Sequence, residues 1–485
     1  MKNLDNIIVV GGGNAGYMSA LILKASFPNK NIRIIQSKKI GTIGVGESSS
    51  EHIAEFCGYV GISKLDFILR AKATFKLGIY FENWAHEDFL HNVDSFSGVS
   101  STVRSHYAYL QSVVAGNKPN YEMNTCGNWL NQVPLNFFND LTQTPSNQFH
   151  FDTHALNQYL REICELKGIT IIEDDIVGAD VDAETGDIGS VNGCRKYYAD
   201  FFIDCSGFSK LLLGKTLGVK WKSYSEYLPL NSAIAYATEE MDEYNMYTKA
   251  TTRSAGWTWQ IPVQGRTGNG YVFSDKYTNF DLAHDELERI YDREITVNKT
   301  FKFDPGRMEK AWHKNCYGVG LSQSFVEPLE ATAIGSVIQQ MYALVHFLPS
   351  NSVDECNEVV DNIFDNIFDY VQAHYLTKRE DTPFWKEVKY NLKITPSLQK
   401  LLDRWKKRFP LAQDVHCRWG MFSEINYIPI LYGLKWFNQE LVSKLYEDIS
   451  HLPVIDWKDS NRKDVLYMGH KDLIHNLNKK NQLRL

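Results

Sequence analysis

The chain has 485 residues, of which 44% are hydrophobic and 22% charged, as in ordinary globular proteins. Its formal net charge of −7 gives no electrostatic reason to bind nucleic acid or an anionic membrane. The most apolar run, which starts at Ile7, is broken by glycines, and the eight cysteines are scattered without CxxC spacing. These features predict a cytoplasmic protein with free thiols and a large core.

Residues 6–10 (NIIVV) predict a short buried strand, and residues 17–27 (YMSALILKASF) predict the helix after it. Between them, Gly11, Gly13 and Gly16 form GxGxxG in the strand–turn–helix setting that a dinucleotide-binding motif requires. The three glycines would allow a tight turn, close approach of a pyrophosphate, and close packing of helix on strand. The phosphates would then lie at the helix N-terminus, beside the motif residues Asn14 and Ala15.

The second predicted strand, residues 31–36 (NIRIIQ), ends where an acidic residue usually binds the ribose. This position holds Gln36, which can still hydrogen-bond ribose hydroxyls. An ordinary glycine-rich turn in an α/β sheet is the less favoured alternative.

A second glycine-rich stretch follows at residues 41–49 (GTIGVGESS). Its glycines allow close backbone approach to a ligand, and a polar glutamate follows them. Two such loops in succession suggest an extended cofactor such as FAD, although a simple turn is an equal alternative without further context. The residues expected at the cofactor are Gly44, Val45, Gly46, Glu47 and Ser48.

Residues 149–172 predict a turn with Asp152 near a helix start, then a helix and a strand. His150 and His154 lie four residues apart, a spacing that can hold a metal on a helix. A third ligand and the acid of an HExxH motif are missing from this stretch, so we predict no metal site.

Residues 199–214 (ADFFIDCSGFSKLLLG) predict a buried strand that ends in Asp204–Gly207 and leads into a helix. In two-domain flavoproteins the chain re-enters the nucleotide domain this way, which places Asp204 and Gly207 near the cofactor. Residues 220–300 contain short strands rich in Trp and Tyr and predict an inserted β-sheet substrate domain.

Residues 256–262 read GWTWQIP, with Trp257 and Trp259 two apart. In a strand, side chains at this spacing share one face, so the two indoles would form a large apolar wall. Packing into a core is the commoner role of such a pair.

Residues 307–348 predict a strand, an irregular loop with Pro328, and a helix that begins near Thr332. The N-terminus of this helix would favour an anion or a flavin carbonyl. After residue 350 the pattern is mostly helical. The chain has a single GxGxxG, which suggests that a flavin here is reduced elsewhere.

Several stretches together resemble the flavin-dependent tryptophan halogenase family, in register over about residues 7–390. The most specific is WxWxIP at 257–262. The other matching stretches are GGGNAGYMSA, IGVGESS, KLGIYFENW, FHFDTHALNQYL, ADFFIDCSGFSKLLL, AWHKNCYGVGLSQSFVEPLEATAI and VQAHYLTKREDTPFW.

The resemblance implies an α/β chain with a Rossmann-type, GR2-like flavoprotein monooxygenase fold, an inserted β-sheet substrate domain and a helical C-terminal part. The FAD-binding part would comprise residues 1–85, 151–215 and 307–350. The substrate side would comprise a lid region at 86–150, the β-sheet domain at 216–306 and the helical region at 351–485.

The resemblance also implies a two-component enzyme. A separate NAD(P)H-dependent flavin reductase would supply FADH2, and O2 would form a flavin hydroperoxide that a bound halide attacks. The hypohalous acid would then travel through a short tunnel to an aromatic substrate. We also expect a homo-oligomer that binds neither nucleic acid nor membrane.

Lys76 matches the position of the family's catalytic lysine, and Glu330 that of its catalytic glutamate. A lysine ammonium can hold and polarise hypohalous acid, or its amine can form a haloamine. A carboxylate can orient the electrophile or take the proton that the ring loses. The alternative for Lys76 is a solvated surface lysine without a catalytic role. The alternative for Glu330 is a residue that caps the start of a helix.

The halide is expected at backbone amides of Thr332 and Ala333, with Pro328 and Ile334 close to the flavin. The family usually has Ser-Thr-Gly where this chain has Ala331–Thr332–Ala333. This difference changes the shape of the halide site, so a preference for bromide or iodide is our hypothesis. The tunnel wall that separates substrate from flavin would comprise Trp257, Trp259, Ile261 and Pro262, with Pro262 at the end of the strand.

The C-terminal segment 418–437 (RWGMFSEINYIPILYGLKWF) does not match the aromatic and acidic residues that hold tryptophan in specific members. We therefore expect a more open site that accepts indoles, phenols or similar small aromatics. A flavin-dependent aromatic hydroxylase is the first alternative, although the tryptophan wall argues against direct access of substrate to the hydroperoxide. A non-catalytic flavin-binding protein is the second, and the retention of Lys76 and Glu330 argues against it.

Overall fold

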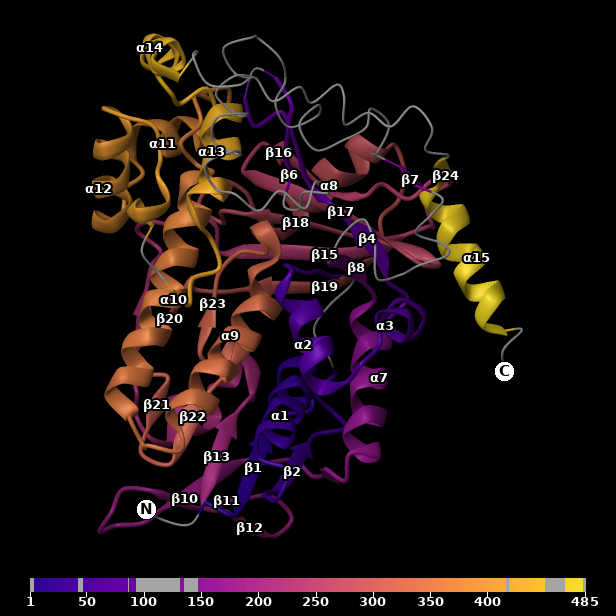
Figure 1. Ribbon diagram of the computed structural model, residues 1–485, viewed down its shortest axis with the longest axis vertical. Helices are drawn as coiled ribbons and strands as arrows, with labels where there is room; N and C mark the ends of the chain where they lie inside the picture. The colour runs from indigo at the N-terminus through magenta and orange to yellow at the C-terminus, as the bar shows by residue number, and fades with distance from the viewer. Residues whose placement is uncertain are drawn as a thin grey trace. The chain divides into compact units, whose positions relative to one another are not determined.

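The computed structural model describes residues 4–41, 47–85, 87–92, 131–134, 147–415, 418–449 and 467–482 (Figure 1). The chain forms two compact units, each built from three separate segments. Unit 1 comprises Met1–Lys72, Phe151–Ser225 and Phe303–Asp365, and unit 2 comprises Ala73–His150, Glu226–Lys302 and Asn366–Leu485. Among the described residues, no helix combines the length and apolar character needed to cross a membrane.

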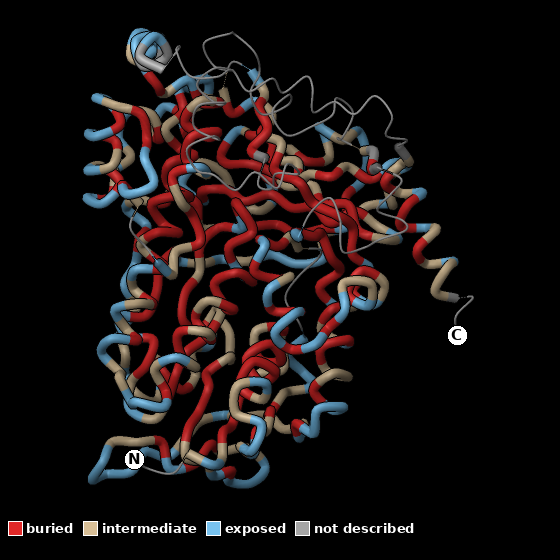
Figure 2. Tube along the Cα trace, viewed as in Figure 1, coloured by how far each residue is buried: buried red, intermediate tan, exposed pale blue. Residues whose placement is uncertain are grey.

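Unit 1 is organised around a six-stranded sheet with the order β21-β22-β13-β1-β2-β9. Its pairs are parallel except for the edge pair β21/β22. The central strands are runs of β-branched and aromatic residues that are buried on both faces, as Figure 2 shows, and this is typical of parallel sheets. The strands are β1 (Asn6–Val10), β2 (Asn31–Gln36), β9 (Thr170–Glu173), β13 (Phe201–Asp204), β21 (Trp312–His313) and β22 (Cys316–Gly318).

Helix α1 follows β1 directly and packs against α7 and α9. The helices of unit 1 are α1 (Asn14–Ser26), α2 (His52–Val60), α3 (Lys64–Arg70), α7 (Thr153–Leu166) and α9 (Thr332–Phe347). Smaller strands are β3 (Glu47–Ser48), β10 (Gly178–Val181), β11 (Ile188–Asn192), β12 (Lys196–Tyr198), β14 (Trp221–Ser223), β20 (Gly306–Met308) and β23 (Ser324–Phe325). Short turns of helix are η2 (Gly207–Ser209), η3 (Leu211–Thr216), η4 (Gly320–Ser322) and η5 (Leu329–Ala331).

Unit 2 is organised around a seven-stranded sheet with the order β19-β15-β18-β17-β16-β5-β6. Its pairs are antiparallel except for β5 and β16, which run parallel. The strands are β5 (Gly78–Glu82), β6 (Phe89–Asn92), β15 (Ser232–Thr238), β16 (Tyr247–Arg253), β17 (Gly256–Val263), β18 (Arg266–Phe273) and β19 (Val297–Lys302). Two further pairs involve β4 (Thr74–Lys76) with β8 (Gln148–Phe151), and β7 (Gln132–Pro134) with β24 (Tyr467–Gly469).

The region after residue 350 is mostly helical, as its sequence predicts. Helices α11 and α12 begin with proline in the first turn, and Thr382 and Thr395 cap them through their side chains. The remaining helices are α8 (Phe280–Tyr291), α10 (Val353–Ala373), α11 (Pro383–Asn391), α12 (Pro396–Trp405), α13 (Glu424–Gly433), α14 (Gln439–Ile449) and α15 (His470–Gln482), with η6 (Ala412–Asp414) between α12 and α13.

The predicted helix after Gly207 is present but irregular, and the predicted helix start near Asp152 is confirmed. The segment after Gly207 is a 3₁₀ turn followed by a π-helix at Leu211–Thr216, because the Asp204 carboxylate accepts the N–H groups of Leu212 and Leu213 and fixes that start. His150 lies on strand β8, whereas His154 lies on helix α7, so the two do not share one helix face.

Candidate functional site

Two glycines of the GxGxxG motif at the junction of β1 and α1, Gly11 and Gly16, lie where the chain itself leaves no room for a side chain. A Cβ at Gly11, where φ is +127°, would lie 2.1 Å from the Cys205 carbonyl oxygen. A Cβ at Gly16 would lie 2.0 Å from the carbonyl oxygen of Gly11. No atom lies within 4 Å of the Cβ position of Gly13, so the backbone there is open to a close approach.

The N-terminus of α1 lacks a side-chain cap, since Gly13 is its N-cap residue and its first turn contains no acidic side chain. Its first N–H groups and the positive end of the helix dipole therefore suit a diphosphate. Asn14 and Ala15 form the first turn, and the Asn14 side chain accepts a hydrogen bond of 3.0 Å from Asn157. Asn157 also donates to the Gly12 carbonyl at 3.0 Å. This brace joins the loop to α7, and no local pattern in the sequence reveals it.

Gln36 lies at the carboxyl end of β2, beside the glycine loop. The Tyr17 hydroxyl donates to Gln36 Oε1 at 2.5 Å. A Cβ at Gly12 would lie 2.1 Å from the same oxygen. With Oε1 committed to Tyr17, the amide NH2 of Gln36 remains as the group that would donate to a ribose oxygen.

Glu47 and Ser48 form the short strand β3, whereas Gly44, Val45 and Gly46 lie outside the described residues. The Thr153 hydroxyl at the start of α7 donates to Glu47 Oε1 at 3.4 Å. Burial raises the pKa of the Glu47 carboxyl to about 7, against the opposing effect of this hydrogen bond.

Glu47 is expected to make the flavin-free protein less stable as the pH rises. Its carboxyl gains a proton near pH 7 in the folded chain and near pH 4.5 in the unfolded chain, so the folded state binds more protons between these values. The free energy of unfolding should therefore fall by about 1–3 kcal/mol from pH 4.5 to pH 7 because of this group. Thermal unfolding at pH 5 and pH 8 should show a smaller loss in Glu47→Gln than in the parent. Equal losses in the two proteins would contradict this assignment.

Asp204 ends strand β13 and is fully buried. One carboxylate oxygen accepts from the backbone and hydroxyl of Ser206, and the other accepts from Leu212 and Leu213 N–H. Gly207 then turns the chain with φ of +67°. The Asp204 side chain thus organises the turn, and its carboxylate oxygens are occupied within the segment.

The turn before α9 has a strained backbone. Pro328 precedes η5. Within η5, two residues that are not glycine adopt the left-handed conformation: Glu330 (φ +65°) and Ala331 (φ +57°). Each such residue costs about 1–2 kcal/mol. Glu330 is nonetheless 4% exposed, so the surrounding fold holds a buried carboxyl in this conformation.

The N-terminus of α9 is a second helix start without a side-chain cap or an acidic residue in its first turn. Thr332 and Ile334 are buried there, and Ala333 is exposed. The helix has 16 residues, so its N–H groups and dipole favour a small anion at this end.

Lys76 is the last residue of β4 and is only 1% exposed. Strand β4 pairs antiparallel with β8, with Thr74 opposite His150 and Lys76 opposite Gln148. These four side chains share one face, while Phe75 and Phe149 form the other face with ring centroids 5.7 Å apart. The structure excludes the interpretation of Lys76 as a solvated surface lysine.

His150 and Thr74 connect this polar face to strands β16 and β17. Its ring nitrogens lie 3.0 Å from Thr248 Oγ1 and 3.4 Å from Thr74 Oγ1, and Thr74 donates to the Pro262 carbonyl at 2.8 Å. Burial, with smaller contributions from Lys76 and His470, holds the pKa of His150 well below its usual range. The imidazole is therefore a neutral neighbour of the lysine.

Strand β17 carries both tryptophans of the wall. Trp257 and Trp259 have ring centroids 6.1 Å apart, which confirms that they share a face. Trp257 is 1% exposed, and Trp259 lies over Gly270 of β18, where a Cβ would lie 2.1 Å from the ring. Regular pairing with β18 gives Ile261 the same face and Pro262 the opposite one, and β17 continues one residue beyond Pro262.

The wall continues into tryptophans that the sequence analysis did not single out. The Trp84 ring lies 6.3 Å from Trp257 and 5.9 Å from Trp385, measured between centroids. Its indole N–H donates to the Ala250 carbonyl at 3.0 Å, and that of Trp385 donates to the Arg253 carbonyl at 2.8 Å. The matched stretches KLGIYFENW and TKREDTPFW contain these residues, but their pairing is visible only in the fold.

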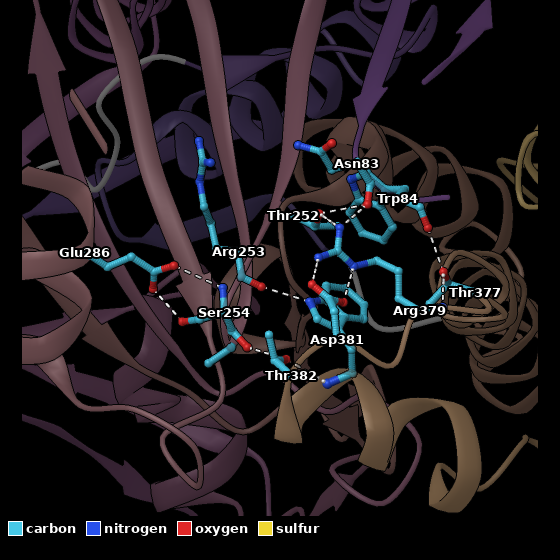
Figure 3. Close-up of polar contacts among 12 residues, drawn as sticks. Asn83, Trp84, Thr252, Arg253, Ser254, Glu286, Thr377, Arg379, Asp381 and Thr382 are labelled. Atoms are coloured by element: carbon cyan, nitrogen blue, oxygen red, sulfur yellow. Dashed lines mark hydrogen bonds and ion pairs between the residues drawn. The ribbon is translucent and has the colours of Figure 1, made fainter. Parts of the chain in front are cut away.

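Arg379 lies beside the cluster of Trp84, Trp257 and Trp385 and hydrogen-bonds to the residues around it, as Figure 3 shows. Its guanidinium donates to the Asn83 carbonyl, to Thr252 Oγ1 at 2.6 Å and to the Asp381 carboxylate, and it lies 5.4 Å from the centre of the Trp385 ring. Nearby, Thr377 donates to the Trp84 carbonyl at 2.6 Å, Thr382 to the Ser254 carbonyl at 2.8 Å, and Ser254 to Glu286 at 2.6 Å. The loop between α10 and α11 is thereby tied to β16 and β17.

The aromatic residues of segment 418–437 are largely used in packing among helices. Phe422 stacks on Tyr370 with centroids 3.9 Å apart, and Tyr427 contacts Trp405 at 5.1 Å. Phe437 packs on Phe409 at 5.0 Å. These rings are buried and form part of the core of unit 2.

Comparisons with known proteins agree with this arrangement. A family model described as tryptophan halogenase matches residues 6–447. The chain is 30% identical to tryptophan 7-halogenase RebH from Lentzea aerocolonigenes, with 89% of each chain covered, and 29% identical to tryptophan 6-halogenase SttH from Streptomyces toxytricini, over 89% of this chain and 90% of the relative. A crystal structure of a tryptophan halogenase from Shewanella frigidimarina NCIMB 400 superposes with a TM-score of 0.85 at 25% identity over 98% of each chain.

Proposed function

Since this chain belongs to the tryptophan halogenase family of flavin-dependent enzymes, we propose that it uses FADH2, O2 and a halide to halogenate small electron-rich aromatics such as indoles or phenols. A separate NAD(P)H-dependent flavin reductase supplies the FADH2. The observation that carries the proposal is Lys76, a lysine only 1% exposed on a face with Thr74, Gln148 and His150. An ammonium group is costly to bury, and a role in holding hypohalous acid accounts for its presence there.

The residues of unit 1 fit FAD. The open backbone at Gly13, the uncapped start of α1 and the Gln36 amide would hold the diphosphate and ribose. Reduced flavin, when bound, supplies with O2 the oxidising equivalents that convert halide into hypohalous acid. The uncapped first turn of α9, at Thr332 and Ala333, would hold the halide through backbone N–H groups.

In this proposal Lys76 acts on hypohalous acid by hydrogen bonding. As the halogen bonds to a ring carbon, the O–X bond breaks and the ammonium transfers a proton to the oxygen, which leaves as water. Negative charge develops on the oxygen as the O–X bond breaks, so the interaction with the ammonium is stronger in the transition state than in the ground state, which is the condition for catalysis.

Glu330 acts as the base in this proposal. After the halogen has bonded to the ring, the same carbon loses its proton, and a carboxylate can accept it. The left-handed turn holds Glu330 just before the N-terminus of α9.

The packing of the C-terminal aromatic rings favours a substrate other than free tryptophan. Phe422, Tyr427 and Phe437 are already packed against Tyr370, Trp405 and Phe409. They are therefore not free to close over an amino acid. We propose a homo-oligomer that acts on free-standing small aromatics, with bromide or iodide favoured by the Ala331–Thr332–Ala333 sequence.

A substrate and halide panel tests this function. Purified protein, FAD, NADH and an added flavin reductase are incubated with indoles, phenols and tryptophan, each with chloride, bromide and iodide in competition, and products are identified by mass spectrometry. Halogenated indoles or phenols that require the reductase are expected. Hydroxylated products with NADPH alone would support the hydroxylase, clear chloride preference would refute the halide proposal, and free tryptophan as the best substrate would refute the substrate proposal.

The double variant Trp257→Phe with Trp259→Phe is expected to lower the amount of product formed per FADH2 oxidised and to raise hydrogen peroxide release. Smaller rings would open the wall, and phenylalanine avoids the loss of about 3–5 kcal/mol expected for alanine. Product and peroxide are measured together, with Trp221→Phe in unit 1 as the control. If both quantities stay unchanged, the pair serves only as core.

A further inference from the structure

His470 is the first residue of α15, far along the chain from β4, and it is fully buried. Its imidazole Nε2 lies 3.0 Å from the backbone nitrogen of Phe75, and its Nδ1 lies 3.2 Å from the Tyr244 carbonyl oxygen. The ring also packs on the Phe75 ring with centroids 5.8 Å apart. His470 thus contacts both the backbone and the side chain of the residue before Lys76.

These two hydrogen bonds determine the state of the ring. A backbone N–H can only donate and a carbonyl can only accept, so Nε2 of His470 must be the acceptor and Nδ1 must carry the proton. The imidazole is therefore neutral and held in one tautomer. Burial lowers the pKa of His470 to about 4, which agrees with a neutral ring at physiological pH.

The hydrogen bond to Phe75 matters because of the direction in which this amide points. Thr74 and Lys76 bracket Phe75 in the pairing of β4 with β8, and alternate amides of an antiparallel strand point to opposite sides. The Phe75 N–H points away from β8, where His470 receives it. On the other side of Lys76, Leu77 donates to the Met246 carbonyl at 2.6 Å. The backbone is therefore held on both sides of the lysine.

We propose that His470 is a positioning residue for Lys76: by accepting the Phe75 N–H, the last described helix of the chain fixes the end of the strand that presents the lysine. This inference rests on the proposed role of Lys76. Without the acceptor, a buried N–H loses its partner and the strand end shifts to find another. A shift of about 1 Å can cost about 100-fold in rate without a large change in substrate binding.

Other contacts anchor α15, so the role of His470 can be separated from helix docking. Leu473, Ile474 and Leu477 form a buried apolar face of the helix. Lys471 pairs with Glu240 at 3.4 Å and donates to the Met241 carbonyl at 2.6 Å. The helix therefore keeps most of its attachment when the imidazole is replaced.

Three variants test the proposal in the full-length enzyme with FAD and the reductase. His470→Leu keeps the bulk without an acceptor, His470→Gln offers an amide oxygen near the position of Nε2, and Lys471→Met weakens helix anchoring only. We expect kcat to fall about 10- to 100-fold in His470→Leu with KM little changed, and to recover largely in His470→Gln. Lys471→Met should keep the parent kcat. Amide exchange at Phe75, followed by mass spectrometry with fragmentation, should be faster in His470→Leu and slow again in His470→Gln.

A folded His470→Leu with the parent kcat would overturn the proposal, and so would a His470→Gln that restores slow exchange at Phe75 but not kcat. If His470→Leu does not fold, His470→Gln is compared with Lys471→Met. The proposal then requires that kcat in His470→Gln falls only as far as the protection of the Phe75 amide from exchange falls, while Lys471→Met keeps the parent kcat. Lys76→Met in the same assay separates the two levels. If Lys76→Met stays active, the proposed role of Lys76 fails; if only His470→Leu stays active, the positioning role alone fails.

Discussion

Replacing Lys76 with methionine is expected to reduce halogenation by about 100- to 10,000-fold while FAD binding stays unchanged. Methionine fills the buried space of the lysine stem but cannot donate a hydrogen bond to hypohalous acid. Lys76 belongs to unit 2, whereas the glycine loop and the α1 start that would hold FAD belong to unit 1. The measurement is product formation at saturating FADH2 and halide, with flavin affinity determined separately by fluorescence.

Lys299→Met is the matched control for this prediction. Lys299 lies on β19 in the same unit and is exposed, so its replacement should leave the rate unchanged. Consumption of FADH2 should continue in Lys76→Met, with the oxidising equivalents released as peroxide or free hypohalous acid. Parent-like halogenation by a folded Lys76→Met would refute the mechanism, and loss of FAD binding would place the lysine in the cofactor site.

The Glu330→Gln variant is expected to lower kcat by about 100- to 10,000-fold with little change in KM. Glutamine keeps the shape of the side chain in the left-handed turn but cannot accept the ring proton. Loss of that proton should then become slow, so a substrate deuterated at the halogenated carbon should react more slowly than the protonated one. The isotope effect is measured in parent and variant; a low rate without an increased effect would assign Glu330 to orientation of the electrophile.

Ala331→Gly separates the charge of Glu330 from the strain of its turn. Glycine adopts the left-handed conformation of residue 331 readily, so this variant should be more stable by about 0.5–1 kcal/mol and keep the backbone path. If Ala331→Gly loses as much activity as Glu330→Gln, the rigidity of the turn is the controlling property. Retained activity in both variants would refute a catalytic role for this segment.

The nucleotide-binding half of the fold could be predicted because its signals are local. Strand β1, the glycine loop, α1 and β2 follow one another within about 30 residues, and Gly11 and Gly16 leave no room for a Cβ. The alternation of Trp257 and Trp259 likewise predicts their shared face, because side chains alternate in any strand.

The supports of the site could not be predicted, because each joins segments far apart in the chain. Asn157 braces the glycine loop from α7, and Arg379 ties Asn83 to the loop before α11. His470 meets Phe75 across 395 positions of sequence. A single amide or imidazole has no periodicity to reveal its partner, so only the packed chain shows these contacts. The π-helix after Gly207 escaped prediction for the same reason, since the buried Asp204 carboxylate sets its start.

By itself the sequence determined the order of strands and helices around the nucleotide loop and the spacing of the two tryptophans, because these depend on neighbours within a few residues. It pointed to Lys76 and Glu330 only through the resemblance to the halogenase family. Only the tertiary structure decided that Lys76 is buried beside a neutral His150, that Glu330 lies in a strained left-handed turn, and that Phe422, Tyr427 and Phe437 pack into the core. Burial and hydrogen-bond partners arise when distant segments exclude water together, and this depends on the whole packed chain.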